Sequence, residues 1–121
     1  MRIYIPKDAV ALTTYKCRKG VQAFRFKRSN NRVSLPREII NCFPDMGADM
    51  FVSPTDKCLY ITFVDKKRAM FYVNRRSAYI SSKSLFEWAT NANVSIHEDY
   101  QYRDYVVDKT SKTVKVSLVR K

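Results

Sequence analysis

The 121-residue chain is poor in the residues that build catalytic and cofactor sites: it has two glycines, one histidine and three cysteines. Two glycines cannot form a glycine-rich loop that cradles phosphates, and no serine-hydrolase, P-loop or zinc-peptidase motif occurs. Cys17, Cys42 and Cys58 are widely spaced, so they offer no paired metal ligands. We therefore expect a protein that is not an enzyme and that needs no metal or other cofactor.

Long apolar runs are also missing. No stretch approaches the roughly 20 apolar residues that a membrane-spanning helix needs. Lys7 and Asp8 interrupt the apolar start too early for a signal peptide. An odd number of separated cysteines is typical of a reducing compartment, and 45% hydrophobic residues suffice for a packed core. These features predict one compact cytoplasmic domain over residues 1–121, without a membrane partner.

Acidic residues are scarce as well. Asp and Glu number 11 against 23 Lys and Arg, which leaves a formal net charge of +12. The basic residues gather in two stretches that contain no acid, residues 16–37 and 66–83. Such stretches create positive potential that attracts a polyanion. Nucleic acid is the leading interpretation, and an acidic protein or a membrane surface is the alternative.

The hydrophobic pattern predicts short strands around two short helices. Residues 23–27 alternate apolar and basic side chains, so Phe24 and Phe26 should face the core while Arg25 and Lys27 face outward. A turn leads to a strand at 32–35, after which Pro36 suits the first turn of a helix. The other predicted elements are strands at 50–52, 58–63, 70–73, 78–80, 100–107 and 113–119, and a helix at 82–90 that Ser81 caps.

The order of these elements repeats. Sliding the chain by 45 residues places Phe26 on Phe71, Leu35 on Ile80 and Phe43 on Trp88. Both halves then follow the order strand, turn, strand, helix, strand, turn, strand, with extra residues in the second half around 97–102. A repeat of this length changes the expected fold. It predicts an N-terminal extension at 1–20, a first unit at 21–65 and a degenerate second unit at 66–121.

The first unit carries a family resemblance. Residues 32–40 read Arg-Val-Ser-Leu-Pro-Arg-Glu-Ile-Ile, residues 47–52 read Gly-Ala-Asp-Met-Phe-Val, and a closing strand follows at 59–63. Over about residues 23–64 this resembles the AbrB family of swapped-hairpin DNA-binding domains, which includes transition-state regulators and MazE-like antitoxins. The resemblance implies a β-rich α+β fold in which two hairpin units interlock into one small barrel. With a second unit in the same chain, the protein would be a monomeric pseudo-dimer; a homodimer is the alternative.

The resemblance also implies which residues contact DNA. Arg25 and Arg32 match basic positions that the family uses, and the basic residues of the family's helix are absent near Ile40 and Asn41. The other candidates lie in the same region or in the corresponding region of the second unit: Lys27, Arg28, Arg37, Arg75, Arg76 and Lys83.

The leading functional hypothesis is a small basic protein that binds double-stranded DNA with some sequence preference, as a transcriptional regulator or antitoxin-like factor of a bacterium or mobile element. One alternative is an RNA or ribonucleoprotein binder. In that case, unpaired bases of the RNA could stack on tyrosines of the predicted strands, namely Tyr72, Tyr79, Tyr102 and Tyr105. Another is a basic protein-interaction module, such as a phage inhibitor of a host nucleoprotein complex.

Overall fold

The computed structural model describes residues 6–9, 23–98 and 100–119, and its elements follow one order twice. The first series is β1 (Arg25–Lys27), the 3-10 turn η3 (Arg28–Asn30), β2 (Arg32–Ser34), α1 (Arg37–Cys42), β3 (Met46–Ser53) and β4 (Cys58–Asp65). The second series is β5 (Val73–Asn74), β6 (Tyr79–Ser81), α2 (Lys83–Asn91), β7 (Tyr105–Asp108) and β8 (Thr113–Ser117). The predicted N-terminal extension, 1–20, lies almost entirely outside the described residues.

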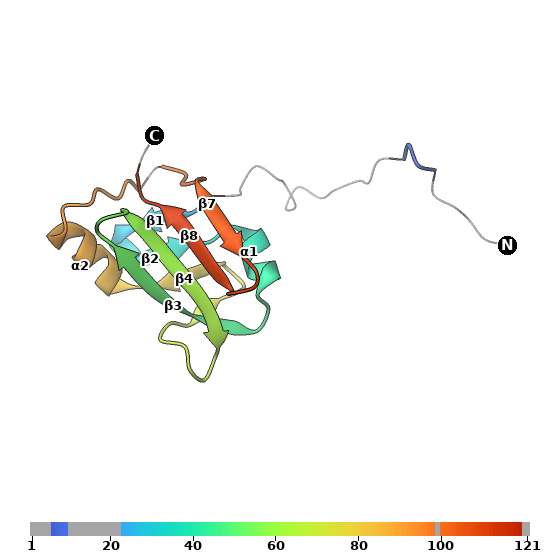
Figure 1. Ribbon diagram of the computed structural model, residues 1–121, viewed down its shortest axis with the longest axis horizontal. Helices are drawn as coiled ribbons and strands as arrows, with labels where there is room; N and C mark the ends of the chain where they lie inside the picture. The colour runs from blue at the N-terminus through green and yellow to red at the C-terminus, as the bar shows by residue number, and fades with distance from the viewer. Residues whose placement is uncertain (1–5, 10–22, 99, 120–121) are drawn as a thin grey trace.

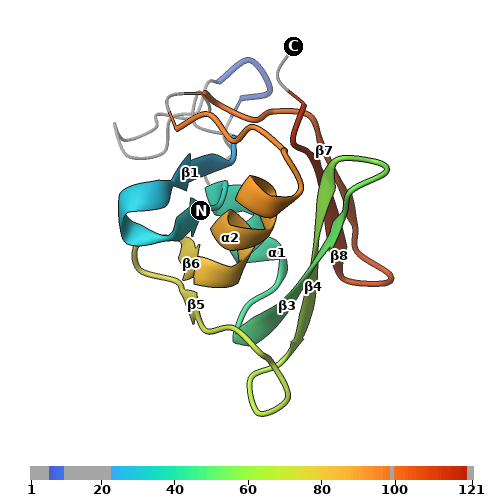
Figure 2. The same ribbon diagram turned by 90° about the vertical axis from the view of Figure 1, so that its left-hand side faces the viewer.

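The strands form two antiparallel four-stranded sheets. The first sheet has the order β1-β2-β6-β5 and the second the order β3-β4-β8-β7. Figure 2 shows the two sheets facing each other with α1 and α2 between them, and Figure 1 shows the two helices at opposite sides of the molecule. The β-rich α+β class is therefore as predicted. Neither of these sheets closes on itself, so the predicted small barrel is not confirmed.

The core lies between the two sheets. Phe26, Val33 and Ile80 reach it from the first sheet, and Leu59 and Val114 reach it from the second, all fully buried. The predicted alternation of the opening strand is confirmed, because Phe26 is buried while Arg25 and Lys27 are exposed. No helix in the described part of the chain has both the length and the apolar character that crossing a membrane requires.

Both helices begin where local chemistry favours a start. α1 follows Pro36, whose missing N–H costs nothing at a helix start. α2 follows Ser82, whose Oγ accepts a hydrogen bond from the Leu85 amide at 3.2 Å. The cap is therefore Ser82 rather than the predicted Ser81. Ser82 is itself buried, whereas Ser81 lies in β6 and is exposed.

The strands expected at 70–73 and 100–107 form regular strands over only part of their length. The strand expected at 70–73 is only β5, because the preceding chain first runs beside β3, where Phe71 and Ala48 exchange two backbone hydrogen bonds. The strand expected at 100–107 begins as a regular strand only at Tyr105. Tyr102 makes an isolated bridge to Phe24 instead, at the edge of the first sheet.

Contacts between the two halves of the chain occur in matched pairs. In the first sheet, the Leu35 amide donates to the Ala78 carbonyl and the Ser82 amide donates to the Asn31 carbonyl, both at 2.8 Å. Ser82 lies 47 residues after Leu35, and Ala78 lies 47 residues after Asn31. Asn31 and Ala78 also share a left-handed backbone, with φ of 53° and 52°. Each half therefore makes the same contact onto the other.

The second sheet shows the same reciprocity at a larger spacing. Phe63 donates its amide to the Lys112 carbonyl at 2.8 Å, and Leu118 donates to the Lys57 carbonyl at 2.9 Å. The matching residues are 55 apart, and Lys57 and Lys112 are both left-handed. The extra residues of the second half thus lie between α2 and β7, which includes the segment around residues 97–102 where the sequence comparison placed them.

The predicted offset of 45 residues is wrong, because the contacts of the first sheet repeat at 47. In that sheet Val33 stands opposite Ile80, the residue that the offset of 45 assigned to Leu35. A slip of two residues leaves every side chain on the same face of a strand. Hydrophobic alternation alone therefore fits both offsets equally well.

Candidate nucleic-acid interface

The outward face of the first sheet carries three of the predicted contact residues. Because Phe26, Val33, Ile80 and Val73 point into the core, the residues beside them in each strand point outward. One row across the sheet aligns Lys27, Arg32 and Ser81; the next aligns Arg25, Ser34, Tyr79 and Asn74. We call these seven residues the basic face.

No acid interrupts this face. The two hairpins that form the first sheet, residues 25–34 and 73–81, contain six Arg and Lys residues and no Asp or Glu. The described acids lie on α1, α2, the second sheet and the loops. A sheet face with charges of one sign holds a positive potential that attracts a polyanion.

Aromatic side chains accompany the cations. The Arg32 guanidinium lies 4.1 Å from the centre of the Tyr79 ring, a cation–π contact that holds the arginine against the sheet. Tyr72 directly precedes the buried Val73, and 77% of its surface is exposed. The basic face and its β5 edge therefore offer two tyrosines that sequence analysis had linked to RNA binding. Their alternation with Val73 and Ile80 is the signal that could have placed them on this face.

The two halves of the chain contribute differently to the face. The 47-residue correspondence pairs Arg25 with Tyr72, Lys27 with Asn74, and Arg32 with Tyr79. The first half supplies all three cations, and the second half supplies neutral side chains at the same places. A ligand crossing this face therefore meets positive charge on one side and tyrosine on the other.

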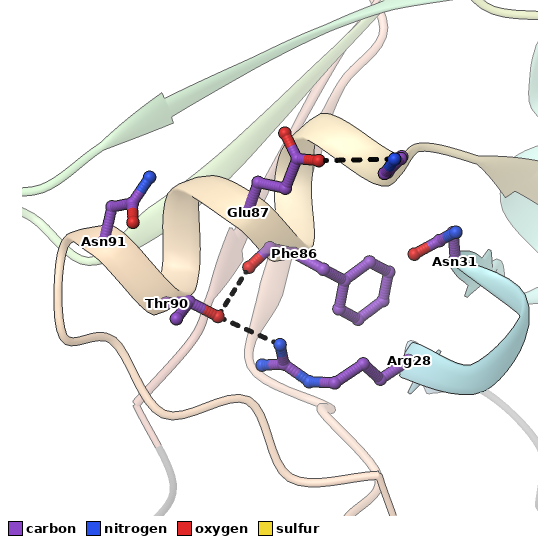
Figure 3. Close-up of a pocket in the computed structure, with 7 residues that line it drawn as sticks. Arg28, Asn31, Phe86, Glu87, Thr90 and Asn91 are labelled. Carbon is purple, nitrogen blue, oxygen red and sulfur yellow. Dashed lines mark hydrogen bonds and ion pairs between the residues drawn. The ribbon is translucent and has the colours of Figure 1, made fainter.

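Arg28 lies beside the basic face, in the turn between β1 and β2. Its Nη1 donates to Thr90 Oγ1 at 3.0 Å, and its guanidinium carbon lies 5.6 Å from the centre of the Phe86 ring (Figure 3). Its backbone amide donates to the carboxylate of Glu98 at 2.6 Å. Arg28 is exposed, but its side chain is directed toward α2 rather than along the sheet face.

Arg75, the residue that corresponds to Arg28, serves the fold. Its Nη2 donates to the carbonyls of Phe43 at 2.6 Å and Met46 at 3.0 Å, and its Nη1 donates to the carbonyl of Ile40 at 3.2 Å. The carbonyls at the end of a helix lack partners within the helix. Arg75 thus caps the C-terminal end of α1, which leaves little of its guanidinium for a ligand.

The remaining predicted contacts are divided between support and solvent. Arg37 donates to the carbonyls of Arg75 at 2.6 Å and Arg76 at 3.1 Å, so it braces the turn between β5 and β6. Arg76 is exposed in that turn. Lys83 is exposed at the start of α2, with its Nζ 3.7 Å from the carboxylate of Glu87.

The second acid-free stretch is not one surface. Lys66 lies in the loop after β4 and forms an ion pair of 2.5 Å with Asp45. The hydrogen bond and charge of Lys66 hold the pKa of Asp45 below its ordinary value. Figure 2 shows this loop at the lower end of the molecule, apart from the β1–β2 hairpin. Lys66 therefore lies apart from the basic face, although it belongs to the same acid-free stretch of sequence as Arg75 and Arg76.

The other two tyrosines of the RNA hypothesis support the core. Tyr102 is buried and meets the Phe26 ring edge to face, with ring centres 5.0 Å apart. Tyr105 stacks on Phe24 at 5.3 Å, and its hydroxyl donates to the carboxylate of Glu38. Burial, followed by the hydrogen bond to Glu38, raises the pKa of the Tyr105 phenol. Cross-strand packing explains both side chains.

Within the residues that the structure describes, no cluster of three or more His, Cys, Asp or Glu side chains could hold a metal ion. Comparison with protein-family models, with curated proteins and with solved structures finds no match for this chain. The chemistry of the basic face is therefore the basis on which a function can be argued.

Proposed function

We propose that this protein binds double-stranded DNA through the basic face. The observation that carries the proposal is the acid-free outer surface of a four-stranded sheet, on which Arg25, Lys27 and Arg32 project from two neighbouring strands. Most protein–DNA contacts go to phosphates, and arginine also recognises guanine edges in the major groove. These three side chains suit both tasks.

We further propose that the chain is a single-chain pseudo-dimer of AbrB-like units. The strand orders support this interpretation, because β2 pairs with β6 and β4 pairs with β8, so each sheet combines one hairpin from each unit. The turn arginines support it too. Arg28 of the first unit bonds to Thr90 on α2, and Arg75 of the second unit caps α1. Such exchange is what interlocked hairpins require.

The difference between the halves defines the kind of DNA site. A symmetric dimer presents equal halves to a palindrome. Here the cations of the first half correspond to Tyr72, Asn74 and Tyr79 in the second half. We therefore propose an asymmetric operator contacted mainly by the first unit, in keeping with a regulator or antitoxin-like factor that acts as a monomer.

Salt-dependent binding to a DNA duplex tests the proposal. Arg25→Ala and Arg32→Ala should each flatten the slope of log affinity against log salt by about 0.9 for every phosphate that the variant no longer neutralises. Lys109→Ala is the matched control, because Lys109 is an exposed cation in the turn between β7 and β8. If neither arginine variant changes duplex binding and both stay folded, the basic face does not bind DNA.

A second candidate is single-stranded nucleic acid, favoured by the exposure of Tyr72. Aromatic rings at a positively charged surface stack on unpaired bases, at about 1–3 kcal/mol per base. Tyr72→Ala should then weaken binding to single-stranded RNA or DNA by about tenfold or more and leave duplex binding unchanged. If Tyr72→Ala weakens binding to single strands and to duplex equally, Tyr72 does not act by stacking on unpaired bases.

A further inference from the structure

A hollow lies beside the basic face, between the β1–β2 turn and α2. Its volume is about 330 Å³, and its walls are formed by Arg28, Asn31, Lys83, Phe86, Glu87, Thr90 and Asn91. Figure 3 shows Arg28 and Asn31 approaching it from the turn, and Phe86 and Thr90 from the helix. Hollows of at least this size commonly hold small ligands.

The hollow is lined by two cations, Arg28 and Lys83, by one acid, Glu87, and by the uncharged polar side chains of Asn31, Thr90 and Asn91. Arg28 uses one N–H on Thr90, and its other guanidinium N–H groups have no hydrogen-bond partner among the described residues. The half-buried side-chain amide of Asn31 also lacks a partner within that part of the chain. Lys83 adds a second cation on the helix side. Its ion pair with Glu87 spans 3.7 Å, and both side chains are largely exposed, so water screens the pair strongly.

The corresponding place in the second half is occupied by the protein itself. There Arg75 takes the position of Arg28, but its donors reach the carbonyls of Ile40, Phe43 and Met46. Ala78 takes the position of Asn31 and offers no side-chain donor. The two turns thus share a backbone design, and only the first leaves its arginine and amide facing a hollow.

We propose that this hollow binds a phosphate group. Arg28 supplies free guanidinium donors, Asn31 an amide donor and Lys83 a mobile ammonium, which together match the acceptor oxygens of phosphate. Thr90 and Phe86 hold the Arg28 guanidinium in place, so little of its freedom remains to be lost on binding. The phosphate belongs either to a nucleic-acid backbone, which rests on the proposed function, or to a free nucleotide or inorganic phosphate.

Inorganic phosphate, titrated at constant ionic strength, tests the site in the full chain. The side-chain amide signal of Asn31 and the Nε–H signal of Arg28 should shift and saturate in nitrogen–proton NMR spectra. Arg28→Ala and Lys83→Ala should each weaken the affinity about tenfold, the change expected when one charge-assisted hydrogen bond is removed. Lys109→Ala removes the same charge elsewhere and should bind as the wild type does.

Asn31→Asp keeps the test decisive should Arg28→Ala unfold. Aspartate tolerates the left-handed backbone of Asn31 and has the same shape, yet it replaces an amide donor by a negative charge. It should abolish the saturable shift of the Arg28 signal. Asn41→Asp, the same change on the exposed surface of α1, should leave the shift intact. Shifts that stay linear in phosphate, or that are equal in all variants, overturn the proposal.

A DNA duplex separates the two sources of phosphate. If the phosphate belongs to a nucleic-acid backbone, Arg28→Ala and Lys83→Ala should also flatten the slope of log affinity against log salt for duplex binding. An unchanged slope together with abolished phosphate binding supports a free phosphate or nucleotide instead. Failure of the proposed function gives a different result: Arg25→Ala and Arg32→Ala would leave duplex binding unchanged, while phosphate binding at Arg28 persists.

Discussion

Arg75 caps the C-terminal end of α1, and Arg37, at the start of the same helix, donates to the backbone carbonyl of Arg75. The two arginines therefore fasten the six-residue helix to the turn between β5 and β6 at both ends. A helix this short is marginal by itself, so tertiary contacts supply most of its stability.

Replacing Arg75 by Met should destabilise the fold. Met retains the apolar stem but leaves the carbonyls of Ile40, Phe43 and Met46 without that donor, which costs about 1–3 kcal/mol. Chemical denaturation measures this decrease in the free energy of unfolding. Arg76→Ala, an equal change of charge in the same turn, should stay within about 0.5 kcal/mol of the wild type. Equal effects of the two changes would contradict the capping role.

Leu35→Ala should destabilise the fold by about 2–5 kcal/mol, as truncation of a buried leucine does. Leu35 is 5% exposed, and its amide joins the two halves through the Ala78 carbonyl. The midpoint of urea unfolding should fall with little change in the slope. A cost below about 0.5 kcal/mol would show that the Leu35 side chain does not stabilise the core.

Gly47→Ala should destabilise the fold through overpacking. A Cβ atom at Gly47 would overlap the Ala69 Cβ and lie 3.1 Å from the Phe71 carbonyl oxygen, where the chain crosses β3. Overpacking of this kind costs about 1–3 kcal/mol. Adding Ala69→Gly removes the nearer atom and should restore part of the stability. If the double variant is no more stable than Gly47→Ala alone, the contact with Ala69 is not the cause.

The Tyr105 phenol should make stability fall at alkaline pH. Its pKa is raised in the folded state by burial and by the hydrogen bond to Glu38, whereas the unfolded chain titrates near 10. The contribution is therefore complete below about pH 10 and disappears as the pH rises through the folded-state pKa. The stability difference between the wild type and Tyr105→Phe should be constant from pH 7 to about pH 9 and shrink above about pH 10. A difference that does not change with pH would show that this hydroxyl is not linked to folding.

Local chemistry accounts for much of the secondary structure. The alternation of Phe24 and Phe26 with basic residues predicted the first strand and its two faces, and Pro36 marked the start of α1. These features depend only on neighbouring residues. The repeated order of elements was predictable for the same reason, whereas the offset between the copies was not. A register shift of two residues preserves the pattern, and contacts between the two halves, such as the pairing of Val33 with Ile80, distinguish 47 from 45.

The placement of positive charge in two acid-free stretches follows from the amino-acid order alone, because charge belongs to each residue whatever the fold. The role of each cation depends on packing between distant segments. Arg25, Lys27 and Arg32 face outward because their neighbours fill the core. Arg75 turns inward because the paired hairpins bring the end of α1 within its reach. Arg28 and Arg75 occupy matching turns, yet one lines an open hollow and the other caps a helix. That difference arises from contacts between residues far apart in the chain, which no local pattern encodes.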